Sequence, residues 1–264
     1  MSEVYVITSG KGGVGKTTTT ANIGTALAMM GKKVALVDAD IGLRNLDLIL
    51  GLENRVVYDI VNVVEGKCRL KQALIKDKRH KELYMLPAAQ TRDKNAVNEE
   101  QMQKLCEELK KDFDFVLIDC PAGIEQGFKN AVAGADKAIV VTTPEVSAVR
   151  DADRIIGLLE SVGLSDPKLL VNRVRTDMVK KGEMMSIEDI IDLLAISLIG
   201  VVPDDESIIV TSNKGEPAAM DDRTKSGLAY RNVAGRMCGE QIPLMDLDTE
   251  GFFKKFKKLF SKKS

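Results

Sequence analysis

Residues 10–17 of this 264-residue chain, Gly-Lys-Gly-Gly-Val-Gly-Lys-Thr, limit its fold more than any other segment. They match the pattern G-x-x-x-x-G-K-[ST], in which a glycine-rich turn between a strand and a helix surrounds a phosphate group with backbone N–H groups. The apolar run 4–7 precedes the turn and the helical stretch 17–30 follows it, which is the context that the pattern needs. A purely structural glycine turn is the alternative interpretation.

The pattern assigns a role to each polar residue of the turn. Lys16 is predicted to neutralise the β- and γ-phosphates of ATP, and Thr17 to ligate Mg²⁺. The predicted phosphate-binding residues are Gly10, Lys11, Gly12, Gly13, Val14, Gly15, Lys16, Thr17 and Thr18.

Short apolar runs recur along the chain and alternate with helical stretches. Because the runs are nearly continuous, they are typical of strands buried on both faces. The sequence therefore predicts a single-domain α/β fold, doubly wound, with a mostly parallel sheet and helices on both faces. The predicted strands are 4–7, 34–37, 83–86, 115–118, 138–141, 169–171 and 198–202, and the predicted helices are 17–30, 99–111, 146–162, 186–196 and 221–237.

Aspartates follow two of these runs. Asp119 ends the run 115–118, where a second metal-binding carboxylate is expected, although a turn or helix N-cap aspartate is its alternative. Asp38 and Asp40 end the run 34–37, at the sheet edge where ligands bind. We expect Asp40 to bind the metal and to orient or deprotonate the attacking water, with Asp38 in a structural turn, but spacing alone does not separate the two.

Lys11 makes the phosphate loop unusual, and with it the chain resembles the ParA/MinD family of deviant Walker A ATPases. Residues 38–47 and 119–125 resemble the two switch segments of that family, and Thr143-Pro144-Glu145 and Val171-Asn172-Arg173 also fit. The resemblance covers essentially the whole chain.

The resemblance implies further roles. Lys11 would reach across an ATP-sandwich homodimer to the partner's phosphates, and Lys11, Lys16 and Asp40 would be the catalytic residues. Asn172 would contact the adenine, with Pro203 and Asp204 in a second adenine loop, and Arg173 would also belong to the cofactor-binding residues. The residues expected near the dimer interface are Lys11, Glu145, Ser147 and Asp151.

The resemblance is strongest to members that place the division site. It implies an ATP-bound dimer that binds the membrane and recruits a division inhibitor, MinC, until hydrolysis releases it, with MinE as a topological regulator. A flagellar-number regulator, a DNA-partition ATPase and a nucleotide-dependent scaffold with negligible turnover are the alternatives. DNA binding is not expected, because the body of the chain is acidic.

The charge of the chain is divided between its body and its C-terminus. Residues 251–264 hold six lysines and no acid, whereas the remaining residues hold 32 basic and 39 acidic side chains. In a helix the apolar residues of this tail occupy one arc of about 120° and most lysines the other side. An interfacial helix on anionic lipid is favoured over core packing or a nucleic-acid or protein groove. The predicted membrane-contacting residues are Phe252, Phe253, Phe256, Leu259 and Phe260.

The sequence thus predicts an ATPase domain at 1–242, a linker at 243–250 and a membrane-targeting helix at 251–264. Strand-like sequence begins at Val4 and no run is long enough to span a bilayer, so we expect a cytoplasmic protein peripheral to the inner face of the cell membrane. Four scattered cysteines predict buried free thiols and argue against an iron–sulfur carrier. His80 is expected in a solvated loop.

Overall fold

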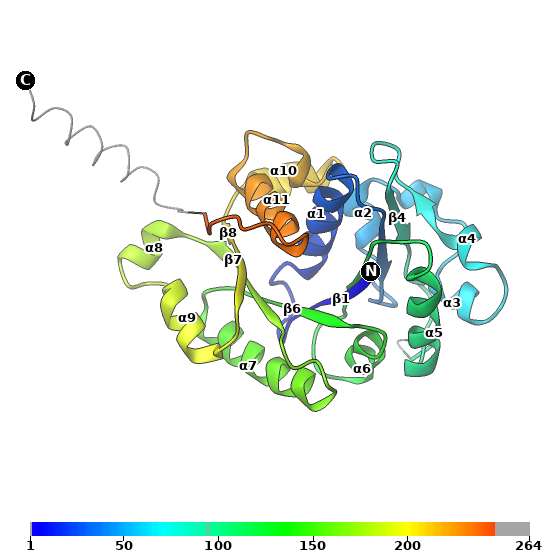
Figure 1. Ribbon diagram of the computed structural model, residues 1–264, viewed down its shortest axis with the longest axis horizontal. Coiled ribbons are helices and arrows are strands. Elements are labelled where there is room, and N and C mark those ends of the chain that lie inside the picture. The colour runs from blue at the N-terminus through cyan, green and yellow to red at the C-terminus, as the bar shows by residue number, and fades with distance from the viewer. Residues whose placement is uncertain (1, 94, 246–264) are drawn as a thin grey trace, which may run out of the picture.

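A central sheet of eight strands organises the part of the chain that the structure describes (Figure 1). The computed structural model describes residues 2–93 and 95–245. The strand order is β3-β4-β2-β5-β1-β6-β7-β8, and every pair is parallel except β3 with β4. The strands are β1 (Glu3–Thr8), β2 (Val34–Asp38), β3 (Ile75–Lys76), β4 (Leu83–Leu86), β5 (Phe115–Asp119), β6 (Lys137–Thr142), β7 (Lys168–Val174) and β8 (Leu198–Pro203).

Helices cover both faces of the sheet (Figure 1). One face carries α1 (Lys16–Met29), α2 (Leu46–Leu50), α10 (Ser207–Asn213), the 3₁₀ turn η2 (Ala218–Met220) and α11 (Lys225–Met237). The other face packs against α3 (Ile60–Val64), α4 (Leu70–Ala73), α5 (Glu99–Leu109), α6 (Gln126–Val132), α7 (Val146–Ser161) and α9 (Ile187–Leu194). The remaining elements are the 3₁₀ turn η1 (Glu53–Arg55) and α8 (Thr176–Lys180).

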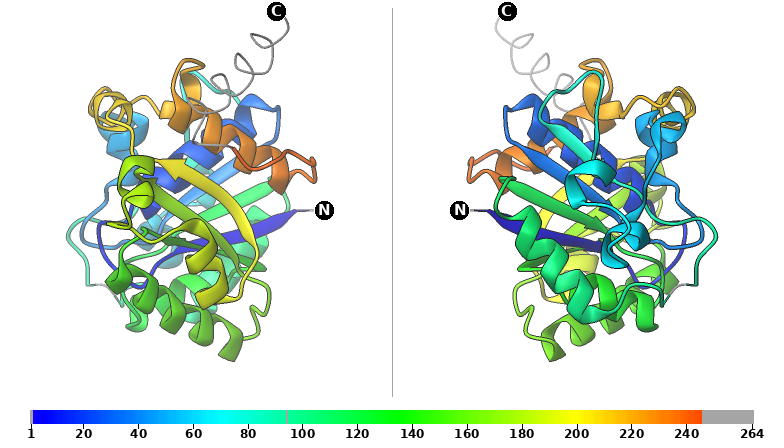
Figure 2. Two further views of the ribbon diagram at one scale, coloured as in Figure 1. Left: turned by 90° about the vertical axis from the view of Figure 1, so that its left-hand side faces the viewer. Right: turned by 90° about the vertical axis from the view of Figure 1, so that its right-hand side faces the viewer.

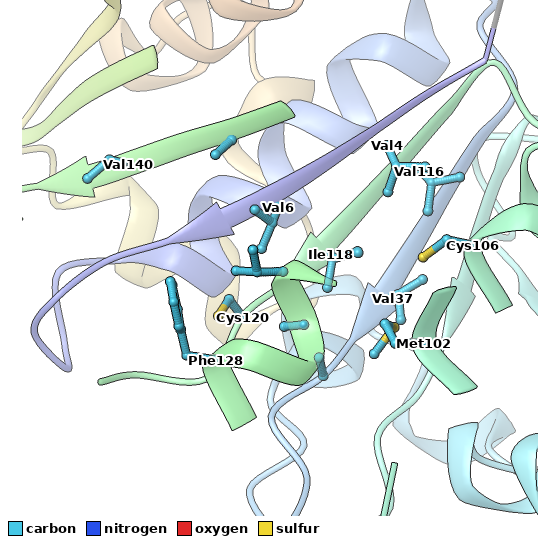
Figure 3. Packing of buried hydrophobic residues seen from close by; sticks show 14 of the residues in the cluster. Val4, Val6, Val37, Met102, Cys106, Val116, Ile118, Cys120, Phe128 and Val140 are labelled. Atoms are coloured by element: carbon cyan, nitrogen blue, oxygen red, sulfur yellow. The ribbon is translucent and has the colours of Figure 1, made fainter. Parts of the chain in front are cut away.

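The alternation of side chains along each strand divides the core into two layers. In β1, Val4 and Val6 belong to one buried cluster, and Tyr5 and Ile7 belong to the other. Figure 3 shows the first layer, in which these two valines lie beside side chains of β2, β5 and β6 and of helices α5 and α6, including Phe128. Both faces of the strand are therefore buried, which explains its continuous apolar sequence.

The predicted fold class is confirmed, with differences at short elements. Every predicted strand forms, but the two-residue strand β3 gives no periodic signal and was not predicted. The predicted helix 221–237 is wrong in its first turn, because the hydroxyl of Thr224 accepts the N–H of Gly227 and starts α11 at Lys225. The helices α2, α3, α4, α6, α8 and α10 have four to seven residues and were missed.

The expectations that all four cysteines are buried and that His80 is solvated are wrong in part. Cys106 and Cys120 are buried, and burial raises the pKa of each thiol to about 12. Cys68 and Cys238 are only half-buried. His80 is also half-buried, in the turn between β3 and β4, where burial lowers the pKa of its imidazole.

The predicted tail, residues 251–264, lies outside the described residues. Of the predicted linker, the described part begins at Pro243, whose carbonyl accepts a hydrogen bond of 2.7 Å from Arg236. In residues 2–93 and 95–245, no helix combines the length and the apolar character needed to cross a bilayer.

The packing of α1 against the sheet supplies a test of the fold. Leu27 is fully buried in the cluster that joins α1 to β2, whereas Met29 in the same helix is exposed. We expect Leu27→Ala to lower the free energy of unfolding by about 2–5 kcal/mol, because it leaves a cavity. Met29→Ala, the matched control, should change it by less than about 0.5 kcal/mol. Urea denaturation measures both values, and equal losses would contradict the assigned packing.

Candidate nucleotide-binding site

The carboxyl ends of three adjacent parallel strands bring the predicted site together. β1 pairs with β5 and β5 pairs with β2, so that Asp119 lies in register with Ile7 on one side and with Asp38 on the other. The glycine-rich loop follows β1 directly and leads into α1. Residues more than a hundred positions apart in sequence therefore meet at one edge of the sheet.

Positive backbone φ angles shape the loop. Gly13 has φ of 80° and Gly15 has φ of 103°, a region that residues with a Cβ rarely adopt. The side-chain amide of Asn172, at the end of β7, donates a hydrogen bond of 2.8 Å to the carbonyl of Val14. A Cβ on Gly15 would collide with that amide. The loop is thus curled, and the hydrogen bond from Asn172 of β7 fixes it.

The two lysines of the loop occupy different environments. Lys16 is 7% exposed, and its Nζ donates a hydrogen bond of 3.0 Å to the hydroxyl of Ser9. The side chain of Lys11 is 41% exposed, and its Nζ lies 3.2 Å from Glu145 and 3.1 Å from Ser147 at the start of α7. Lys16 is therefore an internal charge of the loop, and Lys11 is a surface charge.

The predicted interface residues lie against the loop. Gly10 approaches α7 so closely that a Cβ there would overlap the backbone of Asp151. Glu145 and Ser147 contact Lys11 as described. The structure thus brings all four predicted interface residues to one place, and their role in a dimer stays a prediction.

Two carboxylates are buried beneath the loop. Asp119 lies 3.4 Å from the hydroxyl of Thr20, and Thr17 also donates to it. Burial raises the pKa of Asp119 to about 7, although the hydrogen bond from Thr17 and the charge of Lys16 oppose the shift. Burial and then the charge of Asp119 raise the pKa of Asp38. A cation at this edge would stabilise the ionised carboxylates.

Asp38 and Asp40 differ in what surrounds them. One carboxylate oxygen of Asp38 accepts the N–H of Asp40 at 3.0 Å, and the other accepts the N–H of Leu46 at 3.3 Å. Both oxygens of Asp38 therefore hold the backbone that leads into α2, which fits the structural turn. Asp40 is half-buried in the loop between β2 and α2, and its role toward metal and water stays a prediction.

The site fits Mg²⁺ held jointly with phosphate oxygens. Among the described residues no group of three or more His, Cys, Asp or Glu side chains is arranged to hold a metal. Mg²⁺ is usually held by one or two carboxylates together with substrate phosphates and waters, so such a group is not required. Thr17 and Asp119 lie beside the phosphate loop and supply suitable oxygens.

A cleft of about 400 Å³ continues from the loop toward β8. Asn172 places its amide nitrogen on Val14, so its oxygen Oδ1 is the free end, and this buried oxygen accepts no hydrogen bond. A ligand with an N–H group would satisfy it. The cleft is lined by Gly15, Thr18, Asn172, Arg173, Pro203, Asp204, Asp205, Glu206, Ile208 and Ile209.

Four of these lining residues were not predicted. Ile208 and Ile209 belong to the short helix α10, and Ile209 is exposed. Asp205 accepts the N–H of Ser207 at 2.9 Å and the hydroxyl of Ser226 at 2.8 Å, which ties the cleft loop to α11. Glu206 also lines the cleft. The only available signal was their position directly after the end of β8.

A glycine-rich phosphate loop between β1 and α1, with buried aspartates at the neighbouring strand ends, defines a P-loop nucleotide-binding protein. The chain belongs to the CobQ/CobB/MinD/ParA nucleotide-binding family, whose sequence pattern matches residues 5–218. The family resemblance that the motifs indicated is therefore confirmed.

Individual relatives agree with this assignment. The septum site-determining protein MinD of Bacillus subtilis (strain 168) is 59% identical over 268 residues that span both chains in full. The MinD cell division protein of Aquifex aeolicus has a TM-score of 0.86 and 51% identity, covering 93% of this chain and 100% of that one. MinD of Pyrococcus horikoshii OT3, complexed with Mg-ADP, has a TM-score of 0.83 and 30% identity, covering 92% and 100%.

These similarities establish the activity class. The chain is an ATPase of the MinD type, whose relatives act in placing the division septum. ATP and Mg²⁺ are its cofactors, and the curled loop, Lys16 and Asp119 fit them.

The raised pKa of Asp119 predicts a pH dependence. The folded state binds the proton more tightly than the unfolded state, where the pKa is near 3.8, so this group stabilises the ligand-free protein at low pH. That contribution is lost as pH rises from about 3.8 toward about 7, by about 1.4 kcal/mol for each pH unit between the pKa of the unfolded state and that of the folded state. Asp119→Asn should therefore stabilise the ligand-free protein at pH 8, and should slow ATP hydrolysis by at least about 100-fold.

Thermal unfolding from pH 5 to pH 8, without nucleotide or Mg²⁺, measures the difference between Asp119→Asn and the wild type. Asp166→Asn, at an exposed site, is the control with the same chemical change. A difference in stability that does not grow with pH would contradict the raised pKa.

Proposed function

We propose that this ATPase works as a nucleotide-controlled membrane switch. In this proposal ATP binding joins two chains, the dimer attaches to anionic lipid on the inner face of the cell membrane and recruits a MinC-type division inhibitor, and hydrolysis releases it. A MinE-type regulator would stimulate that hydrolysis. The position of Lys11 is the observation that carries the proposal.

Lys11 is a second loop lysine that does not serve the internal phosphate site of its own chain. Its ion pair with Glu145 is exposed, since the two side chains are 41% and 57% accessible. Exposed pairs of this kind contribute about 0–1 kcal/mol, so little opposes their exchange for another anion. A triphosphate held by a second chain offers a larger charge. Lys11 would complete the charge stabilisation of phosphoryl transfer only in the dimer.

The adenine would occupy the cleft beside the loop. Adenine carries an exocyclic amino group, which can donate to Oδ1 of Asn172, whereas guanine has a carbonyl oxygen at the equivalent position. Pro203 and Asp204 would cover the base, beside Arg173. We therefore expect the site to prefer ATP to GTP.

Hydrolysis is assigned to the edge formed by β2 and β5. Asp40 would orient or deprotonate the attacking water, and Thr17, Asp40 and Asp119 would ligate Mg²⁺ directly or through water. The support is the position of Asp40 on the loop after β2, where its backbone N–H is held by Asp38 and its side chain is half-buried. Lys16 would hold the phosphates throughout.

The tail supplies the attachment. Burying a large apolar side chain yields about 1.5–3 kcal/mol, and a lysine near an anionic surface adds about 1 kcal/mol. Ordering a helix of ten to twelve residues costs about 1–2 kcal/mol per residue. One tail would bind marginally, and two tails on a dimer would gain about 10²–10⁴ in avidity.

The proposed MinC-type partner is supported by the complex of a related protein. A MinD protein of Aquifex aeolicus has been solved in a MinC:MinD complex, with a TM-score of 0.88 and 53% identity to this chain. We extend that partnership to this chain. Division-site placement then requires membrane attachment, dimerisation and inhibitor binding to depend on the same nucleotide.

Lys11→Ala tests the dimer. Light scattering with Mg²⁺ and ATP should double the mass of the wild type and leave the variant monomeric, because the variant lacks the charge offered to the partner's phosphates. The rate of ATP hydrolysis should fall together with dimerisation. Lys181→Ala removes an exposed lysine after α8 and is the control. Unchanged dimerisation of Lys11→Ala would refute the role across the interface.

Phe256→Glu tests the membrane step. Sedimentation with vesicles containing anionic lipid should show ATP-dependent binding of the wild type and at least a tenfold loss in the variant, because a charge enters the apolar side of the predicted helix. Ser261→Glu adds the same charge on the opposite side and should bind more strongly than Phe256→Glu. Equal vesicle binding with ADP and ATP would contradict the switch.

A further inference from the structure

Arg79 joins two helices that belong to different parts of the site. It lies in the turn between β3 and β4, at the edge of the sheet, and its side chain is 28% exposed. Its Nη1 donates a hydrogen bond of 2.7 Å to the carbonyl of Gly215, and its Nη2 donates one of 2.7 Å to the carbonyl of Leu50. These carbonyls lie at the C-terminal ends of α10 and α2.

The turn that presents Arg79 is itself fixed. Asp77 is buried, and one of its oxygens accepts the backbone N–H groups of Arg79 at 2.7 Å and of His80 at 2.8 Å. Its other oxygen lies 3.4 Å from the guanidinium. Asp77 therefore positions the guanidinium independently of its contacts with the two helix ends.

The two helix ends touch through glycine. Gly51 and Gly215 both have left-handed φ angles, of 64° and 67°. A Cβ on Gly215 would lie 2.5 Å from the Cα of Gly51, so the two backbones are in direct contact. Figure 2 shows α2 and α10 side by side at the top of the molecule, and contacts between them agree. Arg79 offsets the partial negative charge of both carbonyls at that contact.

The other ends of the same helices lead to the candidate nucleotide-binding site. α2 begins at Leu46, whose N–H binds Asp38, immediately after the loop that carries Asp40. α10 follows the cleft loop and supplies Ile208 and Ile209 to the cleft wall. The guanidinium of Arg79 thus anchors both α2, which follows the Asp40 loop, and α10, which forms part of the wall of the cleft assigned to adenine.

We propose that Arg79 is a positioning residue that holds the base cleft and the Asp40 loop in register, so that selection of adenine and hydrolysis depend on one anchor. The inference rests on the proposed assignment of the cleft to adenine. Arg79 is not among the residues that line the cleft, and it acts through its hydrogen bonds to the ends of α10 and α2.

The planar guanidinium explains why arginine is needed at this position. Its fixed fork directs separate N–H groups at two carbonyls at once, whereas a lysine ammonium is a compact charge on a flexible stem. Arg79→Lys should therefore keep the charge and lose the fixed spacing between α2 and α10. Arg79→Ala loses both.

Steady-state hydrolysis of ATP and of GTP by the full chain tests the inference. We expect Arg79→Ala to raise KM for ATP about tenfold, equivalent to about 1.4 kcal/mol, and KM for GTP less than about threefold. The preference for ATP falls because the cleft wall loosens while the phosphate loop is unchanged. kcat should fall as well, because the Asp40 loop shares the anchor. Arg79→Lys should lie between Arg79→Ala and the wild type.

The control is Arg223→Ala, which removes an exposed guanidinium paired with Asp221 and should leave both KM values unchanged. Thermal unfolding accompanies the kinetics, and if Arg79→Ala does not fold, Arg79→Lys alone decides. A folded Arg79 variant that keeps the wild-type ratio of KM values would overturn the inference. A wild type that does not distinguish ATP from GTP would instead overturn the adenine assignment itself, and the inference with it.

Discussion

Burial of opposite charges at one sheet edge is the constraint on which the site depends. Lys16, Asp38 and Asp119 are all nearly inaccessible to water, and ions lose most of their stabilisation there unless they are paired or hydrogen-bonded. The raised pKa of Asp119 reports that its own chain compensates it incompletely. Such an edge is suited to receive a nucleotide with its cation. The same buried charges therefore belong to the folded core and favour binding of that ligand.

The contrast between the two lysines of the loop gives this site its second property. Lys16 is enclosed and hydrogen-bonded to Ser9, whereas Lys11 is exposed and makes a solvent-screened ion pair with Glu145 and a hydrogen bond to Ser147. A single glycine-rich turn therefore presents one charge inward and one outward. The inward charge suits a bound phosphate, and the outward charge suits an anion brought by another molecule, which is the basis of the dimerisation proposed above.

The cleft beside the loop owes its shape to contacts distant from it. Asn172 fixes the loop from β7, Asp205 ties the cleft loop to α11, and Arg79 joins the far ends of α10 and α2. None of these contacts is local in sequence. Together they join the cleft, the phosphate loop and the Asp40 segment in one packed body.

The sequence by itself determined the doubly wound sheet, the phosphate loop and Asp119, because apolar strands and the loop motif are local patterns. It left Asp38 and Asp40 unresolved, and it gave no indication of Ile208, Asp205 or Arg79. The tertiary structure shows that Asp38 accepts the backbone N–H groups of Asp40 and Leu46, which fits a structural turn, while the role of Asp40 stays a prediction. It also decided the cleft wall and its anchor, because hydrogen bonds between segments up to 158 positions apart form only when the strands have been ordered in the sheet.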